Sequence, residues 1–99
     1  MKTAIVGSKH YPGAVAAVAR LRKGATLSIV RDAQNPEDSN AVAVYAGPAH
    51  LGYVPRSANA ELARDIDAGH QFVAVLVDEA IIDRGDIRFA AKITISRRA

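Results

Sequence analysis

A polar stretch runs directly into an apolar one at Asn35-Pro36-Glu37-Asp38-Ser39-Asn40-Ala41-Val42-Ala43-Val44. A β-rich run, Thr26-Leu27-Ser28-Ile29-Val30-Arg31, precedes it. Pro36 fixes its own φ, and the Asn, Asp and Ser side chains can hydrogen-bond nearby backbone groups. The sequence therefore predicts a structured loop between two paired strands, at 26–31 and 41–45. A turn needs only one or two such residues, so their excess favours a recognition loop. Asx-turns and strand caps alone would also account for the cluster.

The segments on either side complete a small α+β unit that is mainly β. Short apolar runs predict strands, and alanine-rich runs predict helices. Ser57 is the expected N-cap of the second helix. A charged turn, Asp83-Arg84-Gly85-Asp86, is expected to join the last two strands. The further predicted elements are strands at 3–6, 50–54, 72–77 and 87–95 and helices at 14–21 and 57–68. Six short strands with one or two short helices predict a six-stranded barrel.

Composition narrows the class of protein. The 99 residues are the length of one domain, spanning 1–99, with a single core. A net charge of +3 is compatible with a polyanionic partner without requiring one. The absence of cysteine excludes disulfides and suits a reducing compartment, so we expect a cytoplasmic protein. We expect no membrane association and no signal peptide, because no apolar run is long enough for either.

The sequence also argues against catalysis. It contains no phosphate-binding Gly-rich motif of the P-loop or dinucleotide type. His10, His50 and His70 lack the close spacing of metal ligands, so no metal or other cofactor is expected. His10 could pair with Asp38 as a base and its orienting group, but no nucleophile accompanies them at a recognisable spacing. We therefore expect a protein that is not an enzyme.

Three blocks of this sequence resemble the motifs of the HIRAN domain and occur in the order found in that family. The middle block, with Asn-Pro-x-Asp-x-Asn-Ala ahead of a strand, is the most specific. Together the blocks cover most of residues 3–68. They are Val6-Gly7-Ser8-Lys9-His10-Tyr11-Pro12-Gly13, the stretch from Val30 to Val44, and Leu51-Gly52-Tyr53-Val54-Pro55-Arg56 followed by Ala60-Glu61-Leu62-Ala63.

The resemblance implies a modified OB-like β-barrel that captures single-stranded DNA ends carrying a free 3′-hydroxyl. In eukaryotes such domains are attached to remodelling helicases, whereas bacteria and phages also have the domain alone. This chain has no motor and resembles the stand-alone type. The implied function is a DNA-binding module in DNA repair or replication-fork processing. A helicase or nuclease encoded separately is a further candidate partner.

The first and third motifs of the family imply a set of cations and rings. Lys9 matches a basic position that holds the terminal nucleotides. His10 stands in place of an aromatic residue, and Tyr11 follows it. Tyr53 and Arg56 match a polar ring and a cation of the third motif. Cations suit phosphate oxygens, and aromatic rings stack on any base.

The central motif implies the residues that recognise the strand end. Asp38 matches the acidic residue that accepts the 3′-hydroxyl. Glu37 occupies a position that is often aromatic in the family, and Asn35 matches a loop asparagine close to the end-binding pocket. The predicted DNA-binding residues are therefore Lys9, His10, Tyr11, Asn35, Glu37, Asp38, Tyr53 and Arg56.

Six of these positions also have a purely structural interpretation. Tyr11 and Tyr53 could pack in the barrel, Lys9 and Arg56 could be ordinary solvated charges, and Asn35 and Asp38 could serve only the turn. If all of those interpretations hold, the chain is a protein-interaction or scaffold domain of the same fold with little DNA affinity. Salt dependence separates the two functions, because phosphate-driven binding weakens steeply with salt.

Overall fold

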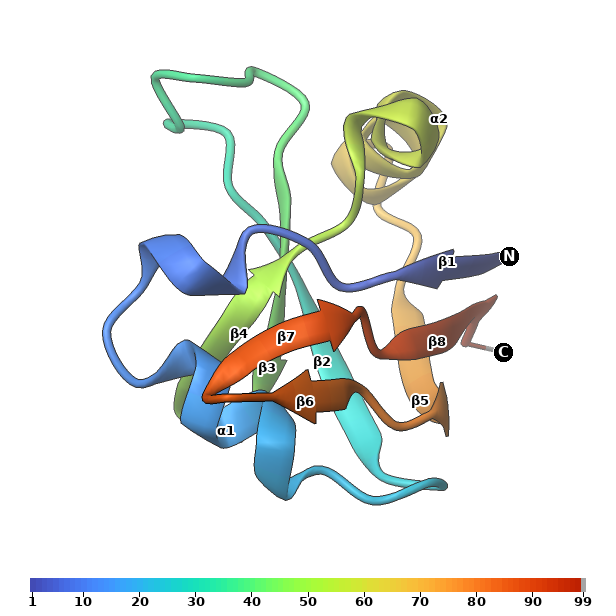
Figure 1. Cartoon of the computed structure of the whole chain (residues 1–99). Helices are drawn as coiled ribbons and strands as arrows, with labels where there is room; N and C mark the ends of the chain where they lie inside the picture. Colours follow the sequence, from blue (N-terminus) through green and yellow to red (C-terminus); the bar gives the residue numbers. More distant parts are fainter. Residues whose placement is uncertain (99) are drawn as a thin grey trace.

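Six strands form one curled antiparallel sheet in the computed structural model, which describes residues 1–98 (Figure 1). Ala99, which the sequence places in the same domain, lies outside the described residues. The prediction of a mainly β fold built on six strands with short helices is confirmed. The strands lie in the order β1-β8-β5-β2-β3-β4 and comprise β1 (Lys2–Ala4), β2 (Thr26–Arg31), β3 (Val42–Ala46), β4 (Ala49–Tyr53), β5 (Phe72–Asp78) and β8 (Lys92–Arg97).

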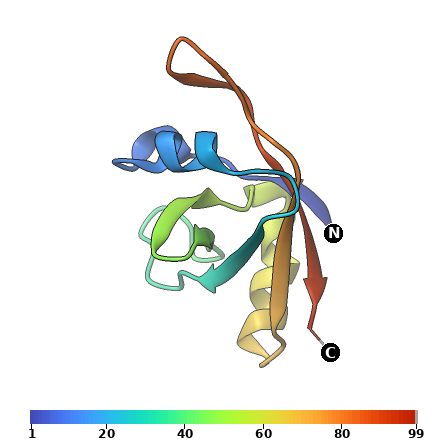
Figure 2. The ribbon, with the colours of Figure 1, turned by 90° about the horizontal axis from the view of Figure 1, so that it is seen from below.

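The curl of the sheet is concentrated at β2, which changes partners along its length. Its first residues, Thr26 and Leu27, pair with β5, whereas Ser28 to Arg31 pair with β3. Figure 2 shows β2 and β5 pointing in different directions beyond the paired residues. Strands that twist past one another in this way roll a sheet into a half-barrel instead of a flat layer.

A backbone bridge joins the two ends of the half-barrel. Val6, just after β1, forms an antiparallel bridge with Tyr53 at the end of β4. Its N–H donates to the Tyr53 carbonyl over 2.9 Å, and the Tyr53 N–H donates to the Val6 carbonyl over 2.8 Å. Gly52 permits this approach, because a Cβ at that position would collide with the Val6 carbonyl oxygen. The bridge therefore fixes the chain leaving β1 directly beside the end of β4.

The helices are η1, a single 3-10 turn (Ser8–His10), α1 (Ala14–Arg20) and α2 (Arg56–Asp67). The prediction that Ser57 caps the second helix is wrong. Pro55 already has the extended backbone of a cap residue, and its carbonyl accepts the Ala58 N–H at 2.9 Å. Proline lacks an N–H to satisfy and is well suited to a helix start. Ser57 consequently lies exposed within the first turn of α2.

The strand predicted at 87–95 is also wrong, because two strands occupy that region. A separate hairpin of β6 (Ile81–Asp83) and β7 (Asp86–Phe89) extends away from the six-stranded sheet (Figure 2), and β8 starts at Lys92. The chain bends at Ala91, which is buried and accepts the Ile5 N–H at 3.0 Å. The predicted charged turn joins β6 to β7. Both of its central residues, Arg84 (φ 54) and Gly85 (φ 82), adopt the left-handed backbone that tight hairpins require.

Small aliphatic side chains fill the interior of the half-barrel. The bulkiest of the fully buried residues are Leu51, Leu76 and Ile93 from three different strands, with Val18 from α1. Leu62 of α2 belongs to the same cluster, which anchors the helix that follows β4. Within residues 1–98, no helix combines the length and apolar character needed to cross a bilayer.

Candidate nucleic-acid interface

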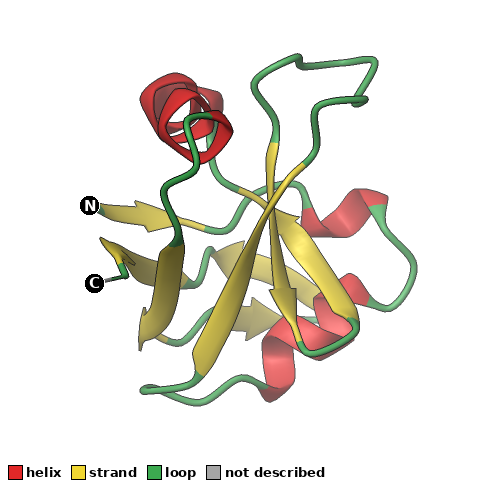
Figure 3. Cartoon of the chain, turned by 180° about the vertical axis from the view of Figure 1, so that it is seen from behind, coloured by secondary structure: helices red, strands yellow, loops and turns green. Residues whose placement is uncertain are grey.

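The loop at 32–41 projects from the sheet on the same side as α2 (Figure 3) and is shaped by two Asx-turns. In the first, the Asn35 side-chain oxygen accepts the Glu37 N–H at 2.8 Å. In the second, Asp38 Oδ1 accepts the Asn40 N–H at 2.9 Å. Because each side chain satisfies a backbone donor two residues further on, the loop is held without regular secondary structure.

A hydrogen-bonded triad ties the base of this loop to the end of β4. The Tyr53 hydroxyl donates to Asp32 Oδ2 at 2.7 Å. Asn35 Nδ2 donates to the same carboxylate oxygen at 3.1 Å and lies 3.3 Å from the Tyr53 hydroxyl. Burial, followed by the hydrogen bond to Asp32, raises the pKa of Tyr53 above its ordinary value. Tyr53 therefore remains a neutral donor that keeps the loop in register with β4.

Four rings gather on the outside of the β3–β4 hairpin. The Tyr11 ring lies 5.7 Å from that of Tyr53 and 4.4 Å from that of His50. His50 contacts Tyr53 edge-on at 5.0 Å and stacks on Tyr45 at 4.9 Å. All four side chains are half-buried, so they pack against one another and still reach the surface. The structural and stacking interpretations of Tyr11 and Tyr53 are thus both compatible with their positions.

Asp38 lies where the loop meets α2. Its Oδ2 accepts the Asn59 side-chain amide at 2.7 Å, and the Arg56 Nε lies 3.7 Å from the same oxygen. The Asn40 N–H bond is the main cause that lowers the pKa of Asp38, against partial desolvation, and Asn59 and Arg56 add to it. The carboxylate is therefore ionised at neutral pH and retains lone pairs for a further donor.

Arg56 and Glu37 meet across the mouth of the loop. Arg56 Nη2 donates to the Glu37 carbonyl oxygen at 2.6 Å. The backbone N–H and the carbonyl of Glu37 are thus both hydrogen-bonded within the protein, while its side chain is exposed. Most of the Arg56 side chain is exposed too, with 71% of its surface accessible. This pair leaves one cation and one anion at the surface beside Asp38.

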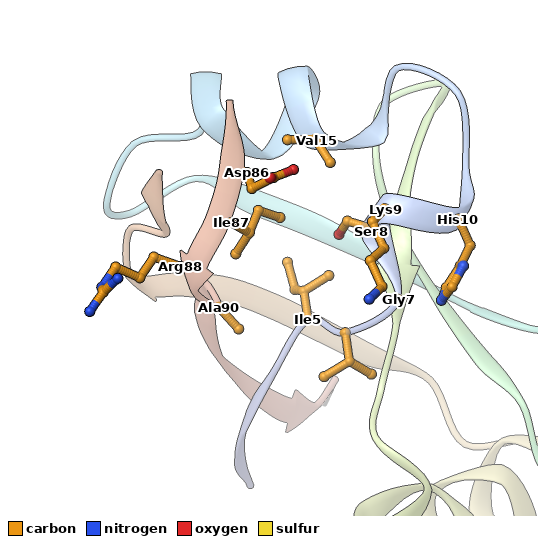
Figure 4. Close-up of a pocket in the computed structure, with 11 residues that line it drawn as sticks. Ile5, Gly7, Ser8, Lys9, His10, Val15, Asp86, Ile87, Arg88 and Ala90 are labelled. Atoms are coloured by element: carbon orange, nitrogen blue, oxygen red, sulfur yellow. The ribbon is translucent and has the colours of Figure 1, made fainter. Parts of the chain in front are cut away.

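Lys9 and His10 lie on η1 and line a different surface. Together with Asp86 and Ile87 of β7, they line a groove of about 620 Å³. Figure 4 shows Asp86 and Ile87 across this groove from Lys9, whereas the Arg88 side chain points away from it. Lys9 and His10 are both exposed. In the described chain, residues 1–98, neither side chain hydrogen-bonds to the loop at 32–41. The structure therefore brings six of the eight predicted residues together around the loop and β4, and places Lys9 and His10 on the adjoining groove.

Several residues of this region were missed by sequence reasoning. Asp32 was assigned no role from the sequence, yet its carboxylate accepts the hydrogen bond of the Tyr53 hydroxyl. Asn59 is a buried amide on α2, whose other buried residues are Leu62 and Ala63. Its position three residues before Leu62, on the same face of the helix, was an available signal. His50 gave no sequence signal beyond its alternation along the strand. Arg88 lies on the hairpin of β6 and β7, and strand β6 was not predicted. No group of three or more His, Asp or Glu side chains within residues 1–98 is arranged to hold a metal ion.

Comparisons with known proteins identify the family of this fold. The model of the HIRAN domain family matches residues 1–97. The chain belongs to the HIRAN domain family. The crystal structure of the HIRAN domain of human HLTF is similar in fold, with a TM-score of 0.74 at 19% sequence identity. That similarity covers 98% of this chain and 73% of the HLTF chain.

A second solved structure is also similar. It is a protein from Lactobacillus plantarum with a TM-score of 0.82 and 25% identity, covering 97% of this chain and 89% of that one. No match was found among curated proteins. HIRAN domains are DNA-binding domains and are not catalytic by themselves. DNA is therefore the class of ligand associated with this family.

Proposed function

We propose that this HIRAN domain is a non-enzymatic module that binds single-stranded DNA ends carrying a 3′-hydroxyl, in DNA repair or replication-fork processing. The observation that supports this most directly is the ionisation and hydrogen bonding of the Asp38 carboxylate. Its carboxylate is ionised, is held by three donors or cations, and has lone pairs left. Such a group accepts a hydrogen bond from a hydroxyl and repels a phosphate at the same position.

The surroundings of Asp38 supply the other contacts that a strand end needs. Arg56 is exposed beside it and can pair with a phosphate oxygen. Tyr53 and Tyr11 offer rings on which bases stack, an interaction worth about 1–3 kcal/mol per base. Lys9, with His10, lines the adjoining groove and provides a further cation along the backbone of the strand. Asn35 and Glu37 complete the predicted contact set at the loop.

The decisive experiment compares two oligonucleotides that differ only at the 3′ end. The hydroxyl form should bind at least about tenfold more tightly than the 3′-phosphorylated form, since tenfold is only about 1.4 kcal/mol and a charge-assisted hydrogen bond supplies that much. In a fluorescence titration, Asp38→Ala should remove the difference by weakening the hydroxyl form. Asp78→Ala, which removes an exposed acid at the end of β5, away from the loop and the groove, is the matched control and should retain it. Equal binding of both forms to the unmodified protein would contradict end recognition.

A specific observation favours the alternative of a scaffold domain. Arg56 already donates to the Glu37 carbonyl at 2.6 Å and lies near Asp38, so a phosphate must compete with contacts inside the protein. Glu37 adds an exposed negative charge at the same place. If neither oligonucleotide binds at low salt, the scaffold function is the better explanation of this surface.

A further inference from the structure

Arg31, the last residue of β2, reaches under the loop and is nearly buried, with 15% of its side-chain surface exposed. Its guanidinium donates to two loop carbonyls, to Ser39 O at 2.7 Å from Nη2 and to Ala41 O at 3.0 Å from Nη1. It also meets the Asp67 carboxylate of α2 at 3.1 Å and 3.3 Å. One side chain thus joins β2, the loop and the last residue of α2.

The two carbonyls that Arg31 holds lie on either side of Asn40, whose N–H reaches Asp38. The Ser39 carbonyl and the Asn40 N–H belong to one planar trans peptide unit, so they point in opposite directions. When Arg31 fixes the oxygen of that unit, it also fixes the direction of the hydrogen. That hydrogen is donated to Asp38 Oδ1 at 2.9 Å. A cation on the carbonyl further polarises the peptide and strengthens its N–H as a donor.

We propose that Arg31 is a positioning residue for Asp38, which it orients through the Ser39–Asn40 peptide unit while Asp67 anchors it to α2. This inference rests on the proposed function of Asp38 as the acceptor of the strand end. Arg31 touches no part of the proposed ligand. Its effect is to keep the carboxylate in one orientation before a strand arrives, so that binding loses less conformational freedom.

The groups around Asp38 allow two effects of Arg31 to be distinguished: its orientation of the Ser39–Asn40 peptide and the effect of its positive charge on the Asp38 carboxylate. Arg56 and Asn59 contact the other carboxylate oxygen directly, whereas Arg31 acts from behind the peptide. The Asn40 hydrogen bond is the main cause of the lowered pKa of Asp38, and the charge of Arg31 is the smallest. Arg31→Lys keeps the charge but cannot span two carbonyls and a carboxylate at once. A change in that variant therefore reports the orientation of the peptide.

The first test needs no DNA. The pKa of Asp38 and the hydrogen exchange of the Asn40 amide are measured by NMR in the unmodified protein and in Arg31→Lys. We expect the Asp38 pKa to rise and the Asn40 amide to exchange about fivefold faster, as for the loss of one hydrogen bond. Arg97→Lys is the matched control, because Arg97 also pairs with an α2 aspartate, Asp65 at 3.8 Å, away from the loop. If Arg31→Lys leaves both quantities as they are in Arg97→Lys, the proposal is wrong.

The second test uses the 3′-hydroxyl and 3′-phosphate oligonucleotides. Arg31→Lys should reduce the preference for the hydroxyl by about fivefold, while Arg97→Lys retains it. Should Arg31→Lys fail to fold, Asp67→Asn removes only the carboxylate that anchors Arg31 to α2. It should likewise raise the Asp38 pKa, speed the exchange of the Asn40 amide and reduce the preference for the hydroxyl. If the pKa of Asp38 rises in Arg31→Lys while the hydrogen exchange of the Asn40 amide is unchanged, Arg31 does not act through the Ser39–Asn40 peptide and the proposal is wrong. If the unmodified protein shows no end preference, the proposed function fails, and the NMR measurements still decide the role of Arg31.

Discussion

Asp38 illustrates how one loop residue can serve stability and recognition together. Its folded pKa lies below the ordinary value of about 3.9, mainly because of the Asn40 N–H. A carboxylate with a lowered pKa stabilises the fold at every pH above its unfolded pKa, and that stabilisation disappears as the pH falls through its folded pKa. The donors that keep Asp38 ionised therefore stabilise the loop at neutral pH, and this stabilisation is lost at acid pH.

This linkage predicts how an Asp38→Asn variant depends on pH. The free energy of unfolding of the unmodified protein should exceed that of the variant above about pH 4, and the difference should shrink steadily below it. Urea unfolding at a series of pH values measures this. A difference that is constant from neutral to acid pH would show that the ionised form of Asp38 does not stabilise the fold.

Glu37 allows a gain of binding to be tested. Its backbone N–H and carbonyl are both bonded, and its side chain is exposed, so a substitution should leave the loop intact. Glu37→Tyr should strengthen binding of a single strand by about 1 kcal/mol or more, because a stacking ring replaces a charge that repels phosphate. Glu61→Tyr on the exposed face of α2 controls for a non-specific aromatic effect. Unchanged affinity would place residue 37 outside the site.

At the scale of elements, the bridge between Val6 and Tyr53 depends on a single glycine. Gly52 has φ 148, and a Cβ there would meet the Val6 oxygen, with Ile5 and Ser8 also close. Gly47, in the turn between β3 and β4, has φ 56 but open space around it. A side chain at position 52 would therefore collide with the backbone of Val6, whereas one at position 47 would meet only the strain of a left-handed backbone.

Substitution of these glycines should have unequal effects. Gly52→Ala should destabilise the fold by at least about 2 kcal/mol, because the backbone bridge must open to accept the methyl group. Gly47→Ala should cost about 1 kcal/mol, the strain of a left-handed backbone alone. Thermal or urea unfolding measures both. Equal effects would mean that β4 can move away from Val6 without loss.

Local patterns predicted most elements because those elements follow local rules. Alternation and turn residues located β2 at its observed bounds and β3, β4, α1 and α2 to within one residue. The bend at Ala91 could not be predicted this way, because a hydrogen bond from Ile5, far away in sequence, causes it. The same holds for Arg31, whose role depends on carbonyls and an aspartate that only the folded chain brings together. The motifs identified the loop, while the residues supporting it from β2 and α2 emerged only from the structure.

For the whole molecule, the salt dependence of binding follows the number of phosphates that its cations neutralise. A single strand loses affinity with a slope of about −0.7 in log K against log salt for each neutralised phosphate. Lys9 and Arg56 together should therefore give a slope of about −1.4, reduced by roughly half in Arg56→Met. Affinity measured across a series of salt concentrations tests this. A slope near zero would favour the scaffold function.

The sheet order, with β8 between β1 and β5, decides whether the recognition residues would keep their arrangement in a shorter fragment of the chain. Every predicted contact residue precedes residue 57, so a peptide ending before β5 would carry the complete recognition chemistry. Yet within residues 1–98 the one strand that pairs with β1 is β8, and β2 pairs at its start with β5. In such a fragment, Val6 would have no strand holding it against Tyr53. The recognition residues therefore cannot be grafted as a segment, and a transplant must include the closing strands that contribute none of them.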